Sequence, residues 1–237
     1  MIKSIWFDLD GTLLYNDIET FSKEYFKLLS QKISYLEREE SFLEKLQRAI
    51  YKMMQNRGPK TNEQVFWDSL LPLTNLKKEV LYEFFNSFYK EDFPKLKIFT
   101  KPHPYARKVI ELAFNLGLKV VIATNAVFPL IAIKERLSWA GIDDFPYFLI
   151  TSMEIMHSCK PFLEYYKEIL EIVDEEPENC IMVGNDIEED MVARKILVNT
   201  YLVNGKFSRS DLINKEAPDF IGPLEELLNL LPLLSKR

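Results

Sequence analysis

The segment IWFDLDGTLL (Ile5–Leu14) determines how the whole chain is interpreted. A short apolar run ends in two acids, Asp8 and Asp10, and Gly11 follows at once. The apolar run predicts a buried β-strand, and a glycine permits a sharp turn directly after it. Because a strand has a period of two residues, we expect Asp8 and Asp10 to lean the same way. The segment therefore predicts a buried strand that delivers two carboxylates to one place.

The composition is that of an ordinary globular chain of 237 residues, long enough for one large domain or two small ones. A net charge of -6 leaves no basic excess to neutralise backbone phosphates, so nucleic acid is not expected as a partner. No apolar stretch approaches the roughly 20 residues that span a bilayer, and the start of the chain does not resemble a signal peptide. Cys159 and Cys180 lack metal-ligand spacing. We therefore expect a cytoplasmic protein with reduced thiols and no membrane partner.

Residues 16–92 show helical rather than strand patterns. Aliphatic and aromatic residues recur there at spacings of three and four, which is typical of amphipathic helices. Four segments carry this pattern: IETFSKEYFKLLSQKI, EREESFLEKLQRAIYKMMQ, NEQVFWDSLL and KKEVLYEFFNSFYKE. The breaks NRGPKT and LPLTN separate the later segments. The sequence therefore predicts a block of four helices.

Strands and helices alternate in the rest of the chain. The segments LKVVIATNA, YFLITS, NCIMVGN, NTYLVN and PDFIG have strand character, and the helical patterns between them include FPLIAIKERLSWAG and EEDMVARKI. Such alternation predicts a parallel, doubly wound sheet, and continuous apolar runs indicate strands covered on both faces. We therefore predict an α/β fold with a Rossmann-like core, residues 1–15 plus 93–237, and a four-helix cap, residues 16–92, inserted after the first strand.

Polar residues follow the predicted strands, where open parallel sheets bind their ligands. They are Asp8, Asp10, Thr124, Asn125, Lys160, Asn185, Asp186 and Asp190. Each alone has an ordinary explanation as a cap, turn or surface residue. Together they would place several acids at one edge, which is unfavourable unless cations compensate. A hard divalent cation held by oxygen atoms, together with the ammonium group of Lys160, would supply that compensation.

The segments DLDGTL, ATN, CKP and VGNDIEED resemble, in this order, the four-motif series of the haloacid dehalogenase superfamily. The helical block is similar to the helical cap of its phosphatase branch, which includes phosphoglycolate phosphatases and β-phosphoglucomutase-like enzymes. The resemblance implies that Asp8 is the nucleophile that becomes an aspartyl phosphate and that Asp10 is the general acid and base. It further implies phosphate binding by Thr124, Asn125 and Lys160.

The resemblance also implies a Mg²⁺ site made by the Asp8 carboxylate, the Asp10 backbone carbonyl and the acids after Gly184. This sequence departs from the pattern there, because Asn185 stands where an acid usually follows the glycine. Either Asn185 binds through its amide oxygen or Asp186 takes its place. Asp190 matches the second acid of the motif. The sequence favours Asp186 as the direct ligand, with Asp190 next.

These motifs favour a Mg²⁺-dependent phosphatase acting on a small phosphorylated metabolite. Dehalogenases of the superfamily typically lack the second aspartate, so Asp10 disfavours that activity. A phosphomutase would use the same residues and stays open. A receiver domain is about half this length, and a non-catalytic phosphate-binding module would have no reason to keep all the motif residues. The substrate and the choice between monomer and homodimer stay open, as does whether Arg57 and Lys60 meet a second anionic group.

Overall fold

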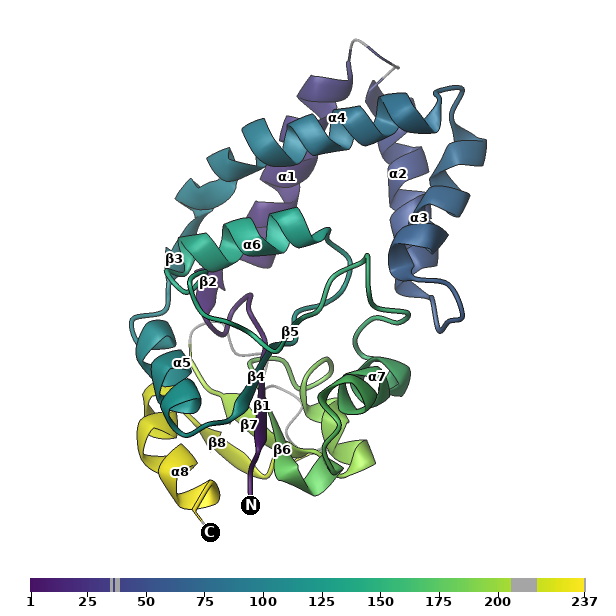
Figure 1. Cartoon of the computed structure of the whole chain (residues 1–237). Coiled ribbons are helices and arrows are strands. Elements are labelled where there is room, and N and C mark those ends of the chain that lie inside the picture. The colour runs from purple at the N-terminus through teal and green to yellow at the C-terminus, as the bar shows by residue number, and fades with distance from the viewer. Residues whose placement is uncertain (35, 37–38, 206–216, 237) are drawn as a thin grey trace.

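The computed structural model describes residues 1–34, 36, 39–205 and 217–236 (Figure 1). Its centre is a six-stranded sheet in the order β5-β4-β1-β6-β7-β8, with every neighbouring pair parallel. The strands are β1 (Ser4–Phe7), β4 (Lys119–Ile122), β5 (Leu149–Ile150), β6 (Cys180–Gly184), β7 (Asn199–Val203) and β8 (Phe220–Gly222). The parallel sheet and its edge strand from PDFIG are confirmed.

Helices cover both faces of the sheet, which explains the apolar strand sequences. Ile5 and Phe7 of β1 pack on the side of α5 (Ala106–Asn115) and α8 (Leu227–Leu234), whereas Trp6 packs on the side of α7 (Leu163–Val173). All three side chains are fully buried. β1 therefore lies in the middle of the sheet with its C-terminal end held rigidly, because both of its faces and both of its edges are occupied.

The predicted helix in EEDMVARKI is instead a short 3₁₀ helix, η4 (Met191–Ile196), preceded by a turn that includes Asp186 and Asp190. The Asp186 side chain accepts hydrogen bonds from the following backbone amides, and such local bonding competes with a regular helix. Three further short 3₁₀ segments are η1 (Leu71–Leu73), η3 (Pro177–Asn179) and η5 (Leu224–Glu226).

The four predicted helices are present and lie over the C-terminal edge of the sheet (Figure 1). They are α1 (Ile18–Ile33), α2 (Glu39–Met54), α3 (Asn62–Leu70) and α4 (Lys78–Glu91). Asp17 caps α1, and Thr61 with Gln64 forms a capping box on α3. The chain then returns to the core through η2 (Phe93–Phe99), above α6 (Leu130–Trp139).

A two-stranded antiparallel ribbon joins the helical block to the core, and the sequence analysis missed it. β2 (Leu14–Asn16) pairs with β3 (Thr100–Pro102), and Leu14 lies opposite Pro102. Both crossings between the block and the core are therefore tied together at one place. Strands of three residues carry too little pattern to be recognised in a sequence.

Candidate active site

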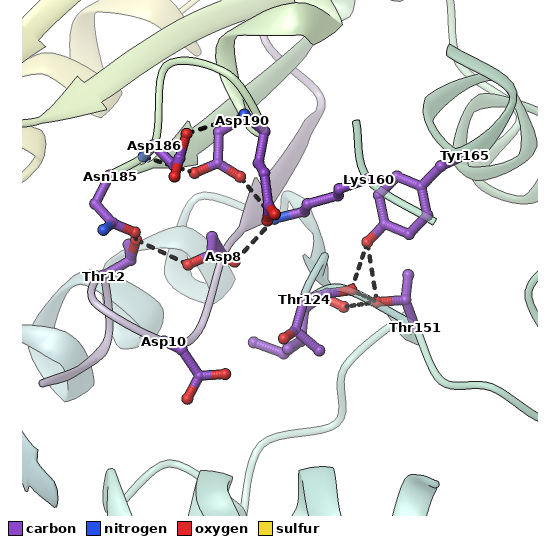
Figure 2. A network of polar contacts seen from close by, with 12 residues as sticks. Asp8, Asp10, Thr12, Thr124, Thr151, Lys160, Tyr165, Asn185, Asp186 and Asp190 are labelled. Atoms are coloured by element: carbon purple, nitrogen blue, oxygen red, sulfur yellow. Dashed lines mark hydrogen bonds and ion pairs between the residues drawn. The ribbon is translucent and has the colours of Figure 1, made fainter. Parts of the chain in front are cut away.

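The centre of the site is the ammonium group of Lys160, which lies between two carboxylates (Figure 2). Lys160 Nζ donates to Asp8 Oδ1 at 2.8 Å and to Asp190 Oδ1 at 2.6 Å. Asp8 follows β1, Asp190 follows β6, and Lys160 precedes α7. Lys160 is 2 % exposed and Asp190 is 1 % exposed, so the cluster is removed from solvent. The structure therefore brings together three of the residues that the sequence places at the strand ends.

Burial and charge act against each other in this cluster. Burial lowers the pKa of Lys160, but the Asp190 and Asp8 carboxylates more than offset that effect and hold the pKa well above its ordinary value. Burial raises the pKa of Asp190, with Lys160 opposing the shift and Asp8 adding to it. The charged lysine therefore offsets the negative charge of two buried carboxylates.

Thr12 and Asn185 complete the surroundings of Asp8. The Thr12 hydroxyl lies 3.1 Å from Asp8 Oδ2 and 3.0 Å from Asn185 Oδ1. A Cβ atom on Gly11 would come within 2.5 Å of Asn185 Nδ2, and one on Gly184 would collide with the Asp190 carboxylate. The two glycines are therefore what allows the loops after β1 and β6 to approach so closely.

Asp10 does not lean the same way as Asp8, which corrects the expectation from strand periodicity. Figure 2 shows its carboxylate turned away from Asp8. Oδ1 accepts from Asn16 Nδ2 at 2.8 Å, and Oδ2 forms an ion pair with Arg136 Nη1. β1 ends at Phe7, so the period of two does not extend to Asp10. Burial raises the pKa of Asp10, while Arg136 lowers it.

Arg136 is a site residue that the sequence analysis missed. It lies on α6, is 2 % exposed, and its guanidinium carbon sits 4.7 Å from the centre of the Phe128 ring. A signal was present: Arg136 is three residues after Ile133 and precedes Leu137, so it falls on the apolar face of its helix. A charged residue on an apolar face indicates a buried partner, which here is Asp10.

Thr124 and Asn125 follow β4 at the same edge. The Thr124 carbonyl accepts from Thr151 Oγ1 and from the Tyr165 hydroxyl, both at 2.7 Å, so the backbone at this strand end is fixed (Figure 2). Asn125 Oδ1 is buried and has no hydrogen-bond partner among the described residues. Such a group is expected to have a partner that the chain itself does not supply.

Asp186 is placed differently from its predicted role. Its Oδ1 accepts from the backbone amides of Glu188 at 2.8 Å and Glu189 at 3.1 Å, so the carboxylate stabilises the turn. Asn185, by contrast, directs its amide oxygen to Thr12 beside Asp8. The amide oxygen of Asn185 therefore lies closer to Asp8 than the sequence led us to expect, and the choice between Asn185 and Asp186 as metal ligand stays a prediction.

Arg57 and Lys60, the positive residues near the NRGPKT break, both have partners within the protein. The Arg57 guanidinium stacks 4.0 Å above the Phe162 ring, and Lys60 forms an exposed ion pair with Asp68 at 2.7 Å. The end of this loop is joined to the core by Asn62, the first residue of α3, whose Nδ2 donates to the carbonyls of Ala126 and Ser158, both at 3.0 Å. These carbonyls lie next to Asn125 and near Lys160, so the loop contacts both sides of the site.

Membrane-spanning helices and clusters of metal-binding side chains are both absent from the described residues. No helix in the described ranges is long and apolar enough to cross a membrane. No three histidine, cysteine, aspartate or glutamate side chains within the same ranges are grouped as a metal site.

Comparisons with known proteins give one family and several relatives. A model of the haloacid dehalogenase-like hydrolase family matches residues 2–195. Glyceraldehyde 3-phosphate phosphatase from Methanocaldococcus jannaschii is 26% identical, with all of both chains covered. Phosphoglycolate phosphatase from Neisseria gonorrhoeae is 25% identical over 99% of this chain and 96% of that protein. A crystal structure of a predicted phosphoglycolate phosphatase from Haemophilus somnus is similar in fold, with a TM-score of 0.59, 16% identity and 97% and 98% of the two chains covered.

Proposed function

Because the chain belongs to the haloacid dehalogenase-like hydrolase family, we propose that it is a Mg²⁺-dependent phosphatase that hydrolyses a small-molecule phosphate monoester. The relatives named above are phosphatases of small molecules, which agrees with this proposal. The observation that carries it is the position of Lys160 Nζ, 2.8 Å from Asp8 Oδ1 at the C-terminal end of β1.

In the proposed reaction Asp8 is the nucleophile. A carboxylate and a phosphate dianion repel each other, and the buried ammonium group of Lys160 offsets that repulsion where the two would meet. One Asp8 oxygen attacks phosphorus and the alcohol oxygen leaves, so that Asp8 becomes an aspartyl phosphate. Thr124, Asn125 and Lys160 are proposed to hold the phosphoryl group, with the Thr124 hydroxyl, the Asn125 amide N–H groups and the Lys160 ammonium group donating to its oxygens.

Asp10 is proposed to move the protons. As an acid it protonates the leaving alcohol oxygen, and as a base it takes a proton from the water that then attacks the phosphorus of the aspartyl phosphate. Because Asp10 is paired with Arg136 and Asn16, its side chain has to release both and turn toward Asp8 before either step. The same carboxyl group then serves in both halves of the reaction.

The donor atoms beside Asp8 fit a hard cation. Asp8 Oδ2 and Asn185 Oδ1 both face the Thr12 hydroxyl, and carboxylate and amide oxygens are ligands that Mg²⁺ accepts. We propose that these two atoms, the Asp10 backbone carbonyl and the Asp190 carboxylate would hold the ion, with Asp186 supporting the turn. Bound Mg²⁺ would neutralise charge on the phosphoryl oxygens.

The helical block is proposed to act as a cap, with residues 16–92 forming it and residues 1–15 plus 93–237 forming the catalytic core. Its position over the C-terminal edge of the sheet supports this role (Figure 1). The β2–β3 ribbon, which joins the block to the core, is the place where a motion of the cap would be centred. The cytoplasmic location and the choice between monomer and homodimer stay predictions.

The experiment is phosphate release from p-nitrophenyl phosphate and a panel of small phosphate esters, with Mg²⁺ and with EDTA. Turnover that requires Mg²⁺ and disappears in Asp8→Asn is expected. Asp68→Asn, which removes an exposed cap carboxylate, is the matched control and should keep the activity. Equal turnover by Asp8→Asn, or turnover in EDTA, would contradict the proposal.

A further inference from the structure

A cavity of about 520 Å³ lies between the four cap helices and the loops that follow β4 and β5. Well-packed interiors hold few voids larger than a water molecule, whereas sites for small ligands commonly enclose about 300–1,000 Å³. The size of this cavity is therefore that of a ligand site and not that of a packing defect.

The cap side of the cavity wall is mainly aromatic, with Ser22 and Asn86 as uncharged polar residues among its lining. α1 contributes Phe21 and Tyr25, α3 contributes Phe66 and Trp67, and α4 contributes Phe85. The aromatic rings contact one another at their edges, with centroids 5.3 Å apart for Phe66 and Trp67 and 5.8 Å apart for Phe66 and Phe85. The cap thus presents ring faces and edges to whatever enters, and such surfaces bind apolar rings well.

The charged residues of the wall disfavour a ligand that carries a second anionic group. Among the described residues that line the cavity, none is a lysine or arginine, and two are the acids Glu63 and Glu154. Both acids already have partners: Glu154 accepts from the Leu130 amide at 2.9 Å, and Glu63 accepts from Trp67 Nε1 at 3.3 Å. A second anionic group on a ligand would meet no free cation on this wall and two carboxylates.

None of the proposed catalytic residues lines the cavity, but two residues of its core side connect it to them. Val127 and Phe128 line it and follow directly on the loop of Thr124 and Asn125. The Phe128 ring lies 4.7 Å from the guanidinium carbon of Arg136, which pairs with Asp10. Since Asp10 is proposed to protonate the leaving oxygen, the alcohol part of a substrate has to extend past Asp10, toward this wall.

We infer that the cavity holds the alcohol part of the substrate and that this part is an uncharged, apolar group that carries a ring. The inference rests on the proposed phosphatase function and gives it a substrate class: phosphate monoesters of arylalkyl or comparable ring-bearing alcohols. Phosphoglycolate, for which one relative is named, carries a carboxylate that this wall does not accommodate.

Binding of phosphonates, which are not hydrolysed, tests the inference by calorimetry in the presence of Mg²⁺. We expect 2-phenylethylphosphonate to bind at least about tenfold more tightly than ethylphosphonate, because only the phenylethyl compound buries a ring. We expect phosphonoacetate to bind no better than ethylphosphonate. Equal affinities for the phenylethyl and ethyl compounds, or a preference for phosphonoacetate, would overturn the inference.

Two variants locate the effect. Ser22 lines the cavity from α1, so Ser22→Trp fills it without removing a wall, and the ratio of the two affinities should fall toward one. Ser41→Trp, at a half-buried serine of α2 that does not line the cavity, should keep the wild-type ratio. A ratio that is unchanged in Ser22→Trp would also overturn the inference.

Turnover of 2-phenylethyl phosphate and ethyl phosphate separates this inference from the proposed function. Both esters release simple primary alcohols of similar leaving ability. A higher kcat/KM for the phenylethyl ester therefore reports binding of the ring. Mg²⁺-dependent turnover without a preference for 2-phenylethylphosphonate over ethylphosphonate would overturn the inference but leave the proposed phosphatase function standing. The phosphonate preference without turnover of any ester would overturn the phosphatase and keep the cavity as a site for ring-bearing phosphoryl compounds.

Discussion

The carboxylate of Asp10 forms an ion pair with the guanidinium group of Arg136, 126 residues later in the chain. Both side chains are largely removed from solvent, with 13% of the Asp10 side chain and 3% of the Arg136 side chain exposed. Nε and Nη2 of Arg136 have no hydrogen-bond partner among the described residues. Asp10 is therefore the group that compensates the buried charge of Arg136, and each of the two stabilises the other.

Removing either partner should destabilise the protein, because the other is left as an uncompensated buried charge. We expect Asp10→Asn and Arg136→Met each to lower the free energy of unfolding by about 3–5 kcal/mol. The double variant should lose less than the sum of the two, with a coupling energy of about 1–3 kcal/mol, measured by urea unfolding. Additivity within about 0.5 kcal/mol would show that the ion pair does not contribute.

Asn62 should be important for stability although it lies in the cap. Its Nδ2 donates to the Ala126 and Ser158 carbonyls, and its Oδ1 accepts from Asn56 Nδ2 at 2.9 Å. Asn62→Leu keeps the size and leaves buried carbonyls unpaired, so the free energy of unfolding should fall by about 2–4 kcal/mol. The exposed Asn86, replaced in the same way, is the control and should change it by less than about 0.5 kcal/mol. Similar losses in both variants would contradict the role of the Asn62 hydrogen bonds.

Asn185 and Asp186 differ in what they should do to Mg²⁺ affinity. Asn185→Asp adds a third carboxylate to the proposed ligands Asp8 and Asp190, so the Mg²⁺ concentration for half-maximal thermal stabilisation should fall about tenfold. Asp186→Asn changes a residue that binds the following backbone amides, and it should leave this concentration within about twofold. A large loss of Mg²⁺ affinity in Asp186→Asn, with none of the expected gain in Asn185→Asp, would restore Asp186 as the direct ligand.

His103 should make stability depend on pH. Burial lowers the pKa of His103 below its ordinary value, with Glu225 opposing the shift, and Nδ1 accepts from the Tyr105 amide at 3.2 Å. Because the folded-state pKa is depressed, the unfolded chain binds the proton first, and stability present above about pH 6.5 is lost as the pH falls below it.

The measurement is the free energy of unfolding at pH 7.5 and 5.5, for the wild type and for His103→Asn. The asparagine oxygen can still accept from Tyr105, but it does not titrate. The loss between the two pH values should therefore be smaller in His103→Asn. An equal loss in both proteins would show that His103 does not cause it.

The parts of the fold that could be predicted were those with long, repeated patterns. The strands and the four helices of the cap could be predicted because their apolar residues follow a regular pattern. Strands buried on both faces are apolar throughout, and helices buried on one face repeat apolar residues at spacings of three and four. The β2–β3 ribbon could not be predicted, because Leu14–Asn16 and Thr100–Pro102 form a pair only once the chain has returned from the cap. The turn before η4 was mistaken for helix because Asp186 bonds the backbone locally.

Most members of the site were predictable, but Arg136 was missed and the expected orientation of Asp10 was wrong. Asp8, Lys160 and Asp190 meet because parallel strands end at one edge. The direction of Asp10 depends on Arg136 and Asn16, which lie on separate elements, and strand periodicity does not reach beyond Phe7. The pairing of these side chains is set by tertiary packing, although the place of Arg136 on the apolar face of α6 was a local signal of a buried partner.

The central claim is that Asp8 carries the phosphoryl group during turnover. The direct measurement is to quench the enzyme with acid during hydrolysis of a good ester, reduce it with borohydride and analyse the peptide that contains residues 5–14 by mass spectrometry. An acyl phosphate at Asp8 is reduced to homoserine, and the account predicts homoserine at position 8 in the presence of substrate and its absence without substrate. Steady turnover with unmodified Asp8, or with the label on another residue, would contradict it.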